Sequence, residues 1–151
     1  MNKKEIVGYT TGVYDLFHIG HLNLLRNAKS HCDKLIVGIT SDEAAQYKNK
    51  KPFIPQEERM AIVEAIKYVD KVVLQDDLDK VKAWDKYHYD VLFVGSDWQG
   101  TPTWQKYEED LAKVGAKVVY IPYTQKTSST ILQETLRKFN EETTKEEALV
   151  H

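Results

Sequence analysis

The sequence contains a single cysteine, Cys32, so an internal disulfide framework is impossible. No apolar run approaches the ~18 residues that a membrane-spanning helix needs, and no long apolar stretch of a secretory signal follows Met1. Neither sign of charge is in excess, because Lys and Arg total 21 and Asp and Glu total 23, a formal net charge of -2 at pH 7. We therefore expect a cytoplasmic protein without membrane insertion or nucleic-acid binding, whose anion sites are local clusters.

Length and composition indicate one globular domain. The chain has 151 residues, of which 42% are hydrophobic and 29% charged, proportions typical of a soluble protein with a substantial core. The last segment, Asn140–His151, is rich in Glu, Thr and Lys. We therefore predict a domain over residues 1–139 and a flexible tail over residues 140–151.

Apolar runs and helical patterns alternate along the chain. Runs such as Leu35-Ile36-Val37 are continuous, which is typical of strands covered on both faces. The predicted strands are Ile6–Thr10, Leu35–Thr40, Lys71–Leu74, Val91–Val94 and Lys117–Ile121. The predicted helices are His21–Ser30, Gln56–Tyr68, Leu78–Lys86, Trp104–Val114 and Ser129–Phe139. This order predicts an α/β fold, a single Rossmann-like domain with a five-stranded parallel sheet and helices on both faces. Ligands of such sheets bind beyond the carboxyl ends of the strands.

The segment Gly12–His21 joins the first predicted strand to the first helix. Gly12 permits a tight turn and the close approach of a ligand, and a helix start attracts phosphate through its unpaired N–H groups and partial positive charge. His18 and His21 are three residues apart and share a helical face, where two imidazoles can stabilise a phosphate as charge builds on it. Spacing alone leaves open an ordinary polar surface or half of a metal site.

This segment resembles the signature of a known superfamily. His18-Ile19-Gly20-His21, preceded by Gly12-Val13-Tyr14-Asp15, is similar to the HxGH motif of the nucleotidyltransferases. Within them the run is most similar to the cytidylyltransferase branch, in particular to the glycerol-3-phosphate cytidylyltransferases. The resemblance implies that His18 and His21 act on the α-phosphate and that their neighbours bind the nucleotide: Gly12, Val13, Tyr14, Asp15 and Gly20. For Asp15, two roles stay open: it orients a water on a metal ion, or it braces the turn.

Basic residues in two later segments match the same branch. Lys48 and Lys50 lie in a lysine-rich segment whose counterparts contact phosphates; Lys51 is the weaker match. We predict that Lys48 acts in catalysis and that Lys50 binds the nucleotide. Arg59 lies near the start of a predicted helix, where it matches a family arginine that faces the acceptor phosphate. We predict catalytic and acceptor-binding roles for Arg59, although a simple pairing with a nearby glutamate would also explain it.

The motif after the fourth predicted strand, Gly95-Ser96-Asp97-Trp98 with Gly100, is similar to the family's Gly-x-Asp-Trp-x-Gly. A tryptophan offers a stacking face, and a carboxylate accepts hydrogen bonds from a ribose hydroxyl or an exocyclic amine. The resemblance implies that Asp97 and Trp98 hold the cytidine. An aspartate turn whose tryptophan packs on the core is the competing hypothesis.

A run of hydroxyl residues precedes the last predicted helix. Ser128, Ser129 and Thr130 match the family's triphosphate-binding end, and hydroxyls at a helix start suit such a ligand. The family's arginine and glycine in this segment are replaced by Tyr123 and Lys126. We predict that Lys126 supplies the missing cation to the nucleotide and that Tyr123 contacts the acceptor.

These residues together predict an enzyme that moves the cytidylyl group from CTP, with Mg²⁺, to a small phosphorylated alcohol, releasing pyrophosphate. The resemblance makes glycerol 3-phosphate the default acceptor, the product a cell-envelope or capsule precursor, and the protein a homodimer. Phosphoethanolamine, phosphocholine and other polyol phosphates stay open as acceptors. An ATP-using adenylyltransferase and a non-catalytic nucleotide-binding module are competing hypotheses. An aminoacyl-tRNA synthetase also carries such a histidine motif, but this short chain without an excess of basic residues disfavours it.

Overall fold

The structure is a computed structural model that describes residues 4–46, 51–122 and 132–141 of the chain. Its elements in order are β1 (Val7–Gly12), α1 (Ile19–Ser30), β2 (Lys34–Thr40), α2 (Asp42–Gln46), α3 (Gln56–Glu64), β3 (Lys71–Gln75), α4 (Lys80–Tyr87), β4 (Val91–Gly95), the 3₁₀ helix η1 (Ser96–Trp98), α5 (Pro102–Ala112) and β5 (Lys117–Ile121). Residues 132–141 are also helical. Residues 142–151 of the predicted tail lie outside the described ranges.

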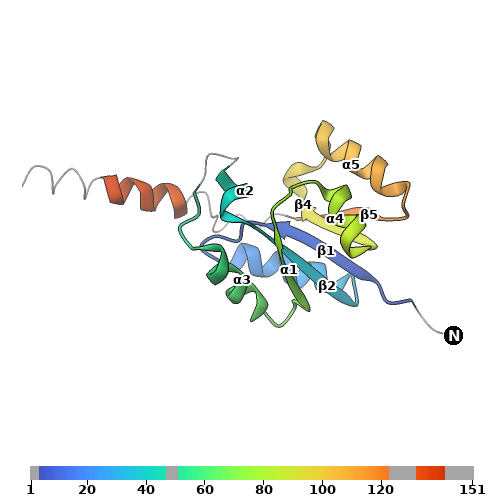
Figure 1. Cartoon of the computed structure of the whole chain (residues 1–151), viewed down its shortest axis with the longest axis horizontal. Coiled ribbons are helices and arrows are strands. Elements are labelled where there is room, and N and C mark those ends of the chain that lie inside the picture. The colour runs from blue at the N-terminus through green and yellow to red at the C-terminus, as the bar shows by residue number, and fades with distance from the viewer. Residues whose placement is uncertain (1–3, 47–50, 123–131, 142–151) are drawn as a thin grey trace, which may run out of the picture.

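The strands form one parallel sheet with β1 at its centre. Their order is β3-β2-β1-β4-β5, so β1 pairs with β2 on one side and with β4 on the other. Because all strands point the same way, their carboxyl ends share one edge of the sheet. Figure 1 shows the N-terminus at the opposite end of the sheet, and α2 and the 132–141 helix at this carboxyl edge.

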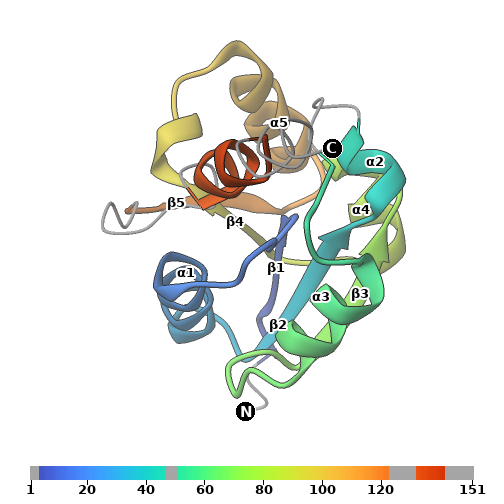
Figure 2. The same cartoon turned by 90° about the vertical axis from the view of Figure 1, so that its left-hand side faces the viewer.

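Helices cover both faces of the sheet (Figure 2), α1 and α3 on one face and α4 and α5 on the other. On the first face Leu25 of α1 and Val63 of α3 pack against strand residues in one apolar cluster. On the second face Ala83 of α4 and Leu111 of α5 pack with Tyr9 in another. Burying apolar residues on both faces explains the continuous runs in the sequence. The predicted fold class is confirmed.

Aspartate carboxylates fix the amino ends of the strands. They accept backbone N–H groups across long stretches of chain: Asp33 from Ile6 at 2.8 Å, Asp90 from Val7 at 2.9 Å and Asp70 from Leu35 at 2.7 Å. A charge-assisted bond to a backbone N–H is stronger than a neutral one. The amino edge of the sheet is therefore held by carboxylates that take no part in the opposite edge, where ligands are expected.

The differences from the sequence prediction lie at helix ends and in short elements. α1 begins at Ile19 rather than His21, because His18 is its N-cap. α3 ends at Glu64 rather than Tyr68, because the chain then tightens into turns in which an N–H bonds to the carbonyl three residues earlier. α2 and η1 have five and three residues, too few for a periodic pattern to show. Among the described residues no helix is both long enough and apolar enough to cross a bilayer.

Candidate active site

α1 begins with a capping box made of two histidines. The N-cap residue is His18, whose Nδ1 accepts the Gly20 N–H at 3.0 Å. The Nδ1 of His21 accepts the His18 N–H at 3.2 Å. Serine or threonine with glutamate or glutamine usually fills these positions. Here the two imidazole rings fill them and stack with centroids 4.0 Å apart, so the helix start itself holds the predicted pair together.

This geometry requires both rings to be neutral. A ring nitrogen that accepts a hydrogen bond carries no proton, so each imidazole holds its proton on Nε2 and is a donor there. Burial, with a smaller contribution from His18, lowers the pKa of His21 to about 3. Burial also lowers the pKa of His18. The start of α1 therefore carries two neutral N–H donors beside the positive end of a helix dipole.

The turn that leads into α1 is strained at residues other than glycine. Tyr14 and Leu16 have left-handed φ angles of 54° and 51°, a conformation that non-glycine residues adopt at a cost and that clusters at functional sites. Gly12, which we expected to make the turn, is instead the last residue of β1. A Cβ at Gly12 would lie 2.9 Å from the Tyr14 ring. The glycine therefore makes room for a tyrosine that packs in the core.

Asp15 braces this turn from inside the protein. Its side chain is 1% exposed, and its carboxylate accepts the backbone N–H groups of Phe53 and Ile54, each at 2.9 Å. The Gln133 amide in the 132–141 helix donates to the same carboxylate at 2.7 Å. Of the two roles left open for Asp15, these contacts support bracing.

Arg59 is a buried hub of the loops at the carboxyl edge. The residue is 1% exposed, and its guanidinium donates to the carbonyl oxygens of Val13 (2.6 Å), Thr40 (2.8 Å) and Ile54 (2.8 Å). It also forms an ion pair with Asp42 at 2.6 Å. Four of its five N–H donors are thus committed to this chain. These contacts support a positioning role, and the acceptor-phosphate role stays a prediction.

Asp97 and Trp98 lie in η1, directly after β4, and both are exposed. The Trp98 side chain is 48% exposed, so it is not packed into the core as a purely structural aspartate turn would require. A Cβ on Gly95 would come within 2.7 Å of the Asp97 carboxylate. The structure therefore brings an open indole face and a carboxylate to the carboxyl end of β4, and their nucleotide role stays a prediction.

Several predicted site residues lie outside the described residues: Lys48, Lys50, Tyr123, Lys126, Ser128, Ser129 and Thr130. The described chain on either side of residues 47–50 is tied together. The Asp42 N–H donates to the Gln56 side chain at 2.9 Å, and the Gln56 N–H donates to the Asp42 carboxylate at 3.3 Å.

Sequence reasoning missed Gln133, whose partner Asp15 lies 118 residues away. It also missed the Asp42–Gln56 pair, whose members are 14 residues apart and carry no local motif. The Arg137 guanidinium, one helical turn after Gln133, lies 5.3 Å from the centre of the Phe53 ring. The 132–141 helix therefore contacts the turn after β1 through Asp15 and the segment before α3 through Phe53. Among the described residues, no three His, Cys, Asp or Glu side chains come together as a metal site.

Comparisons with known proteins agree with this architecture. The family model described as cytidylyltransferase-like matches residues 9–143. The chain is similar to the glycerol-3-phosphate cytidylyltransferase of Staphylococcus aureus, 35% identical over 88% of this chain and 95% of that protein. It is equally similar to the enzyme of the same name from Bacillus subtilis, 35% identical over 87% of this chain and 95% of that protein. Among solved structures, a lipopolysaccharide core biosynthesis protein from Thermoplasma volcanium superposes with a TM-score of 0.69 at 26% identity, over 82% of this chain and all of that one.

The capping box predicts a pH dependence of stability. The pKa of His21 is lower in the folded state than its ordinary value of 6.5. The unfolded chain therefore binds a proton at His21 more readily than the folded chain does. The stability that a neutral His21 contributes is lost as the pH falls below about 6.5. In His21→Gln, glutamine completes the capping box and does not titrate. We expect the melting temperature of His21→Gln to fall less steeply than that of wild type between about pH 7.5 and 5.

His31→Gln, at the C-cap of α1, is the matched control, because it removes an imidazole that lies outside the capping box. Parallel curves for wild type and His21→Gln would mean that the two rings do not cap the helix in their neutral form.

Arg59→Met should destabilise the fold. It leaves three carbonyl oxygens and the Asp42 carboxylate without their donor, a loss of about 3–5 kcal/mol when a buried ion pair is broken. We expect the melting temperature, followed by circular dichroism, to drop by roughly 10 °C. Arg26→Met removes a guanidinium whose partners are exposed, so it should change the melting temperature little. An unchanged melting temperature in Arg59→Met, with a weakened phosphorylated substrate, would restore the ligand role of Arg59.

Proposed function

The chain belongs to the cytidylyltransferase-like family, and on that basis we propose that it transfers the cytidylyl group of CTP to a small phosphorylated alcohol. A phosphate oxygen of the acceptor attacks the α-phosphorus of CTP. The bond to the bridging oxygen breaks, and pyrophosphate leaves with its electron pair. A CDP-alcohol and pyrophosphate are the products.

The histidine capping box is the observation that most strongly supports this proposal. Transfer at phosphorus needs positioned reactants and stabilisation of the charge that builds on the phosphate oxygens. Two neutral Nε2–H donors at one helix N-terminus supply such stabilisation without desolvating a cation. The rings are already fixed by their bonds to Gly20 and His18 N–H, so little reorganisation is needed when charge develops.

The remaining residues take roles around this centre. Trp98 and Asp97 stand exposed at the end of β4 and hold the cytosine and ribose by stacking and hydrogen bonding. Lys48, Lys50, Lys126 and the hydroxyls of Ser128–Thr130 hold the triphosphate. CTP enters with Mg²⁺, which is held by the triphosphate and neutralises part of its charge. The named relatives make glycerol 3-phosphate the first acceptor to test.

The direct test mixes the protein with CTP, MgCl₂ and glycerol 3-phosphate, follows pyrophosphate release and identifies the product by mass spectrometry. We expect a CDP-alcohol, and faster turnover with CTP than with ATP. Faster turnover with ATP would make the chain an adenylyltransferase. Nucleotide binding without pyrophosphate release over a panel of phosphorylated alcohols would make it a binding module.

The two histidines should be essential for turnover but replaceable in the fold. His18→Asn keeps an oxygen that caps the helix, and His21→Gln keeps the N3 partner of the box, while each removes one imidazole donor. We expect kcat to fall about 10²–10³-fold in either variant, as for the loss of one preorganised donor. The melting temperature of each variant at pH 7.5 shows whether it is still folded. Activity within about threefold of wild type in both variants would rule out this role.

Trp98→Ala should weaken CTP binding through the base alone. Stacking of a base on an aromatic ring contributes about 1–3 kcal/mol, so we expect the KM for CTP to rise roughly tenfold. Inhibition by pyrophosphate, which carries no base, should stay unchanged. An equal loss for both ligands would show that the whole pocket had collapsed.

A further inference from the structure

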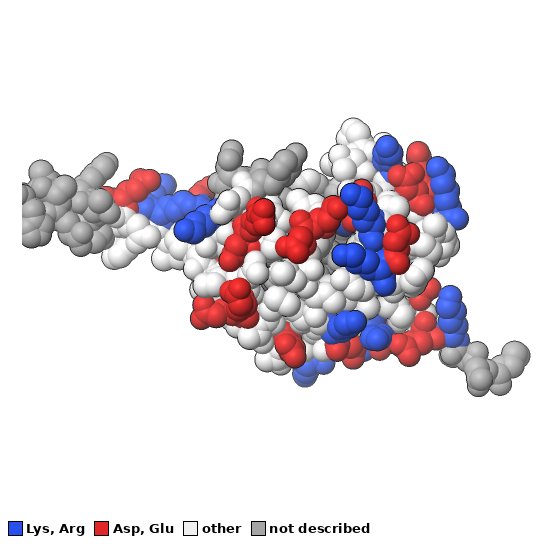
Figure 3. All heavy atoms as spheres, in the orientation of Figure 1, with Lys and Arg blue, Asp and Glu red and all other residues white. Residues whose placement is uncertain are grey.

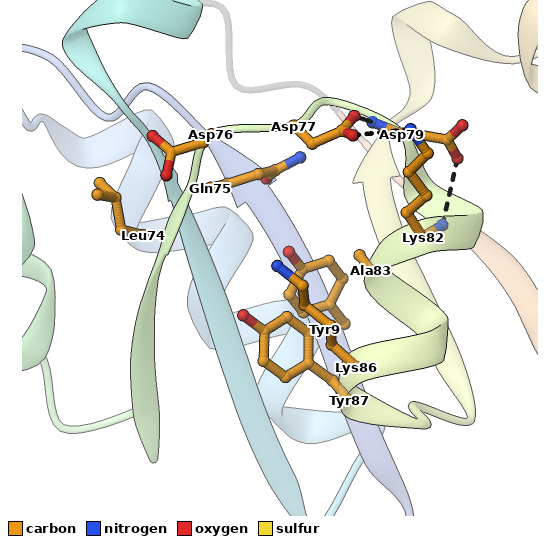
Figure 4. A pocket seen from close by; sticks show the side chains of 10 residues that line it. All are labelled: Tyr9, Leu74, Gln75, Asp76, Asp77, Asp79, Lys82, Ala83, Lys86 and Tyr87. Atoms are coloured by element: carbon orange, nitrogen blue, oxygen red, sulfur yellow. Dashed lines mark hydrogen bonds and ion pairs between the residues drawn. The ribbon is translucent and has the colours of Figure 1, made fainter.

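A cavity of about 140 Å³ lies between the carboxyl end of β3 and the helix α4. Figure 4 shows its polar residues, Gln75, Asp77 and Lys82, around an opening above the rings of Tyr9 and Tyr87. The cavity is on the sheet face opposite α1, and it opens at the edge where the strands end. Acidic and basic side chains stand next to one another on this face of the molecule (Figure 3).

The lining of the cavity contains a buried amide with unmet hydrogen bonds. Gln75, the last residue of β3, is 5% exposed. Among the described residues neither its Nε2 nor its Oε1 has a hydrogen-bond partner. Such a group costs free energy unless something pairs with it. A Cβ on Gly38 would lie 3.0 Å from this Oε1, so the neighbouring strand leaves just enough room for the amide.

Five charged residues also line the cavity: Asp76, Asp77, Asp79, Lys82 and Lys86. Asp77 pairs with Lys82 at 3.1 Å and accepts the Asp79 N–H at 2.9 Å. Asp79 caps α4 by accepting the Val81 N–H at 2.9 Å. Asp77, Asp79 and Lys82 are thus partnered within the protein, whereas the Gln75 amide has no partner among the described residues. The wall beneath it is aromatic, since Tyr9 stacks with Tyr87 at 5.4 Å and with Tyr89 at 5.0 Å between ring centroids.

An amide with both atoms unpaired selects among ligands. An ammonium N–H only donates, and would leave Nε2 unpaired, and a trimethylammonium group has no N–H and would leave both atoms unpaired. A phosphate or carboxylate oxygen only accepts, and would leave Oε1 unpaired. A hydroxyl both donates and accepts, and two adjacent hydroxyls satisfy both atoms of the amide. The carbon-bound hydrogens of such a ligand pack well against tyrosine rings.

The cavity and the histidine turn lie on opposite faces of the sheet, but the strands that carry them, β3 and β1, end at the same carboxyl edge. β3 lies two strands from β1, roughly 10 Å away, a distance comparable to the length of an extended phosphorylated polyol. The Lys80 ammonium at the start of α4 donates to Thr11 at 2.9 Å, directly before Gly12 and the turn that leads into α1. The cavity wall and the catalytic turn are thus joined through β1.

We propose that this cavity binds the hydroxylated end of the phosphorylated acceptor, and that Gln75 selects a polyol phosphate over an ammonium-bearing acceptor such as phosphoethanolamine or phosphocholine. This inference rests on the proposed cytidylyl transfer. It makes Gln75 a specificity-determining residue of that reaction.

The first test needs no variant. With CTP and the wild-type protein, kcat/KM should be at least about tenfold higher for glycerol 3-phosphate than for phosphoethanolamine, because one acceptor pairs both amide atoms and the other pairs one. Equal or better turnover of phosphoethanolamine would overturn the polyol assignment and leave the transfer reaction standing. Absence of pyrophosphate release with any phosphorylated alcohol would overturn both.

The second test is Gln75→Met, which keeps the length of the side chain and removes its hydrogen bonds. We expect the KM for glycerol 3-phosphate to rise roughly tenfold to a hundredfold and the KM for CTP to stay within about twofold. The melting temperature should hold or rise, because an unpaired buried amide is lost. A lower melting temperature with an unchanged acceptor KM would show that Gln75 is only structural. Gln105→Met, on the exposed side of α5, is the matched control and should change neither constant.

Discussion

The hydrogen bonds of the buried Arg59 guanidinium hold together the loops at the carboxyl edge of the sheet. Arg59 joins the turn after β1, the end of β2, the start of α2 and the segment before α3 through one planar group. Lysine cannot replace it, because an ammonium has no fixed fork of donors with which to meet several carbonyl oxygens at once. The loops around the site are thereby held in one arrangement. Asp15 completes the frame with a buried carboxylate that meets the same segment from the other side.

In the capping box, the helix start and the proposed chemistry both require His18 and His21 to be neutral. Protonating His18 or His21 on Nδ1 would remove an acceptor from the helix start and also turn a neutral donor into a cation that burial disfavours. The lowered pKa values keep both rings in the form that the helix needs. A neutral imidazole is also suited to donate a hydrogen bond to phosphate oxygens, because it neither gains nor loses a proton during the transfer.

The sequence predicts most of the fold, because its signals are local. Continuous apolar runs such as the one at Leu35 mark strands covered on both faces, and the pattern around His18 marks a helix start at the end of a strand. The burial of Arg59 was not predictable, since its partners lie up to 46 residues away and the residue types near it fit a surface helix equally well. Gln133 meets Asp15 across 118 residues, and nothing near Gln75 in the sequence signals a cavity. Site residues of this kind are defined by tertiary contacts alone.

The central place of β1 also has a consequence during synthesis. One edge of β1 pairs with β2 soon after it is made, but its other edge pairs with β4, and the Val7–Asp90 bond that fixes this pairing spans 83 residues. On the ribosome, this edge of β1 therefore stays unpaired until β4, more than 80 residues later, has emerged. Such edges are sites of aggregation and slow folding. The turn that carries the two histidines also depends on a later segment, since Asp15 bonds with Gln133 118 residues further on.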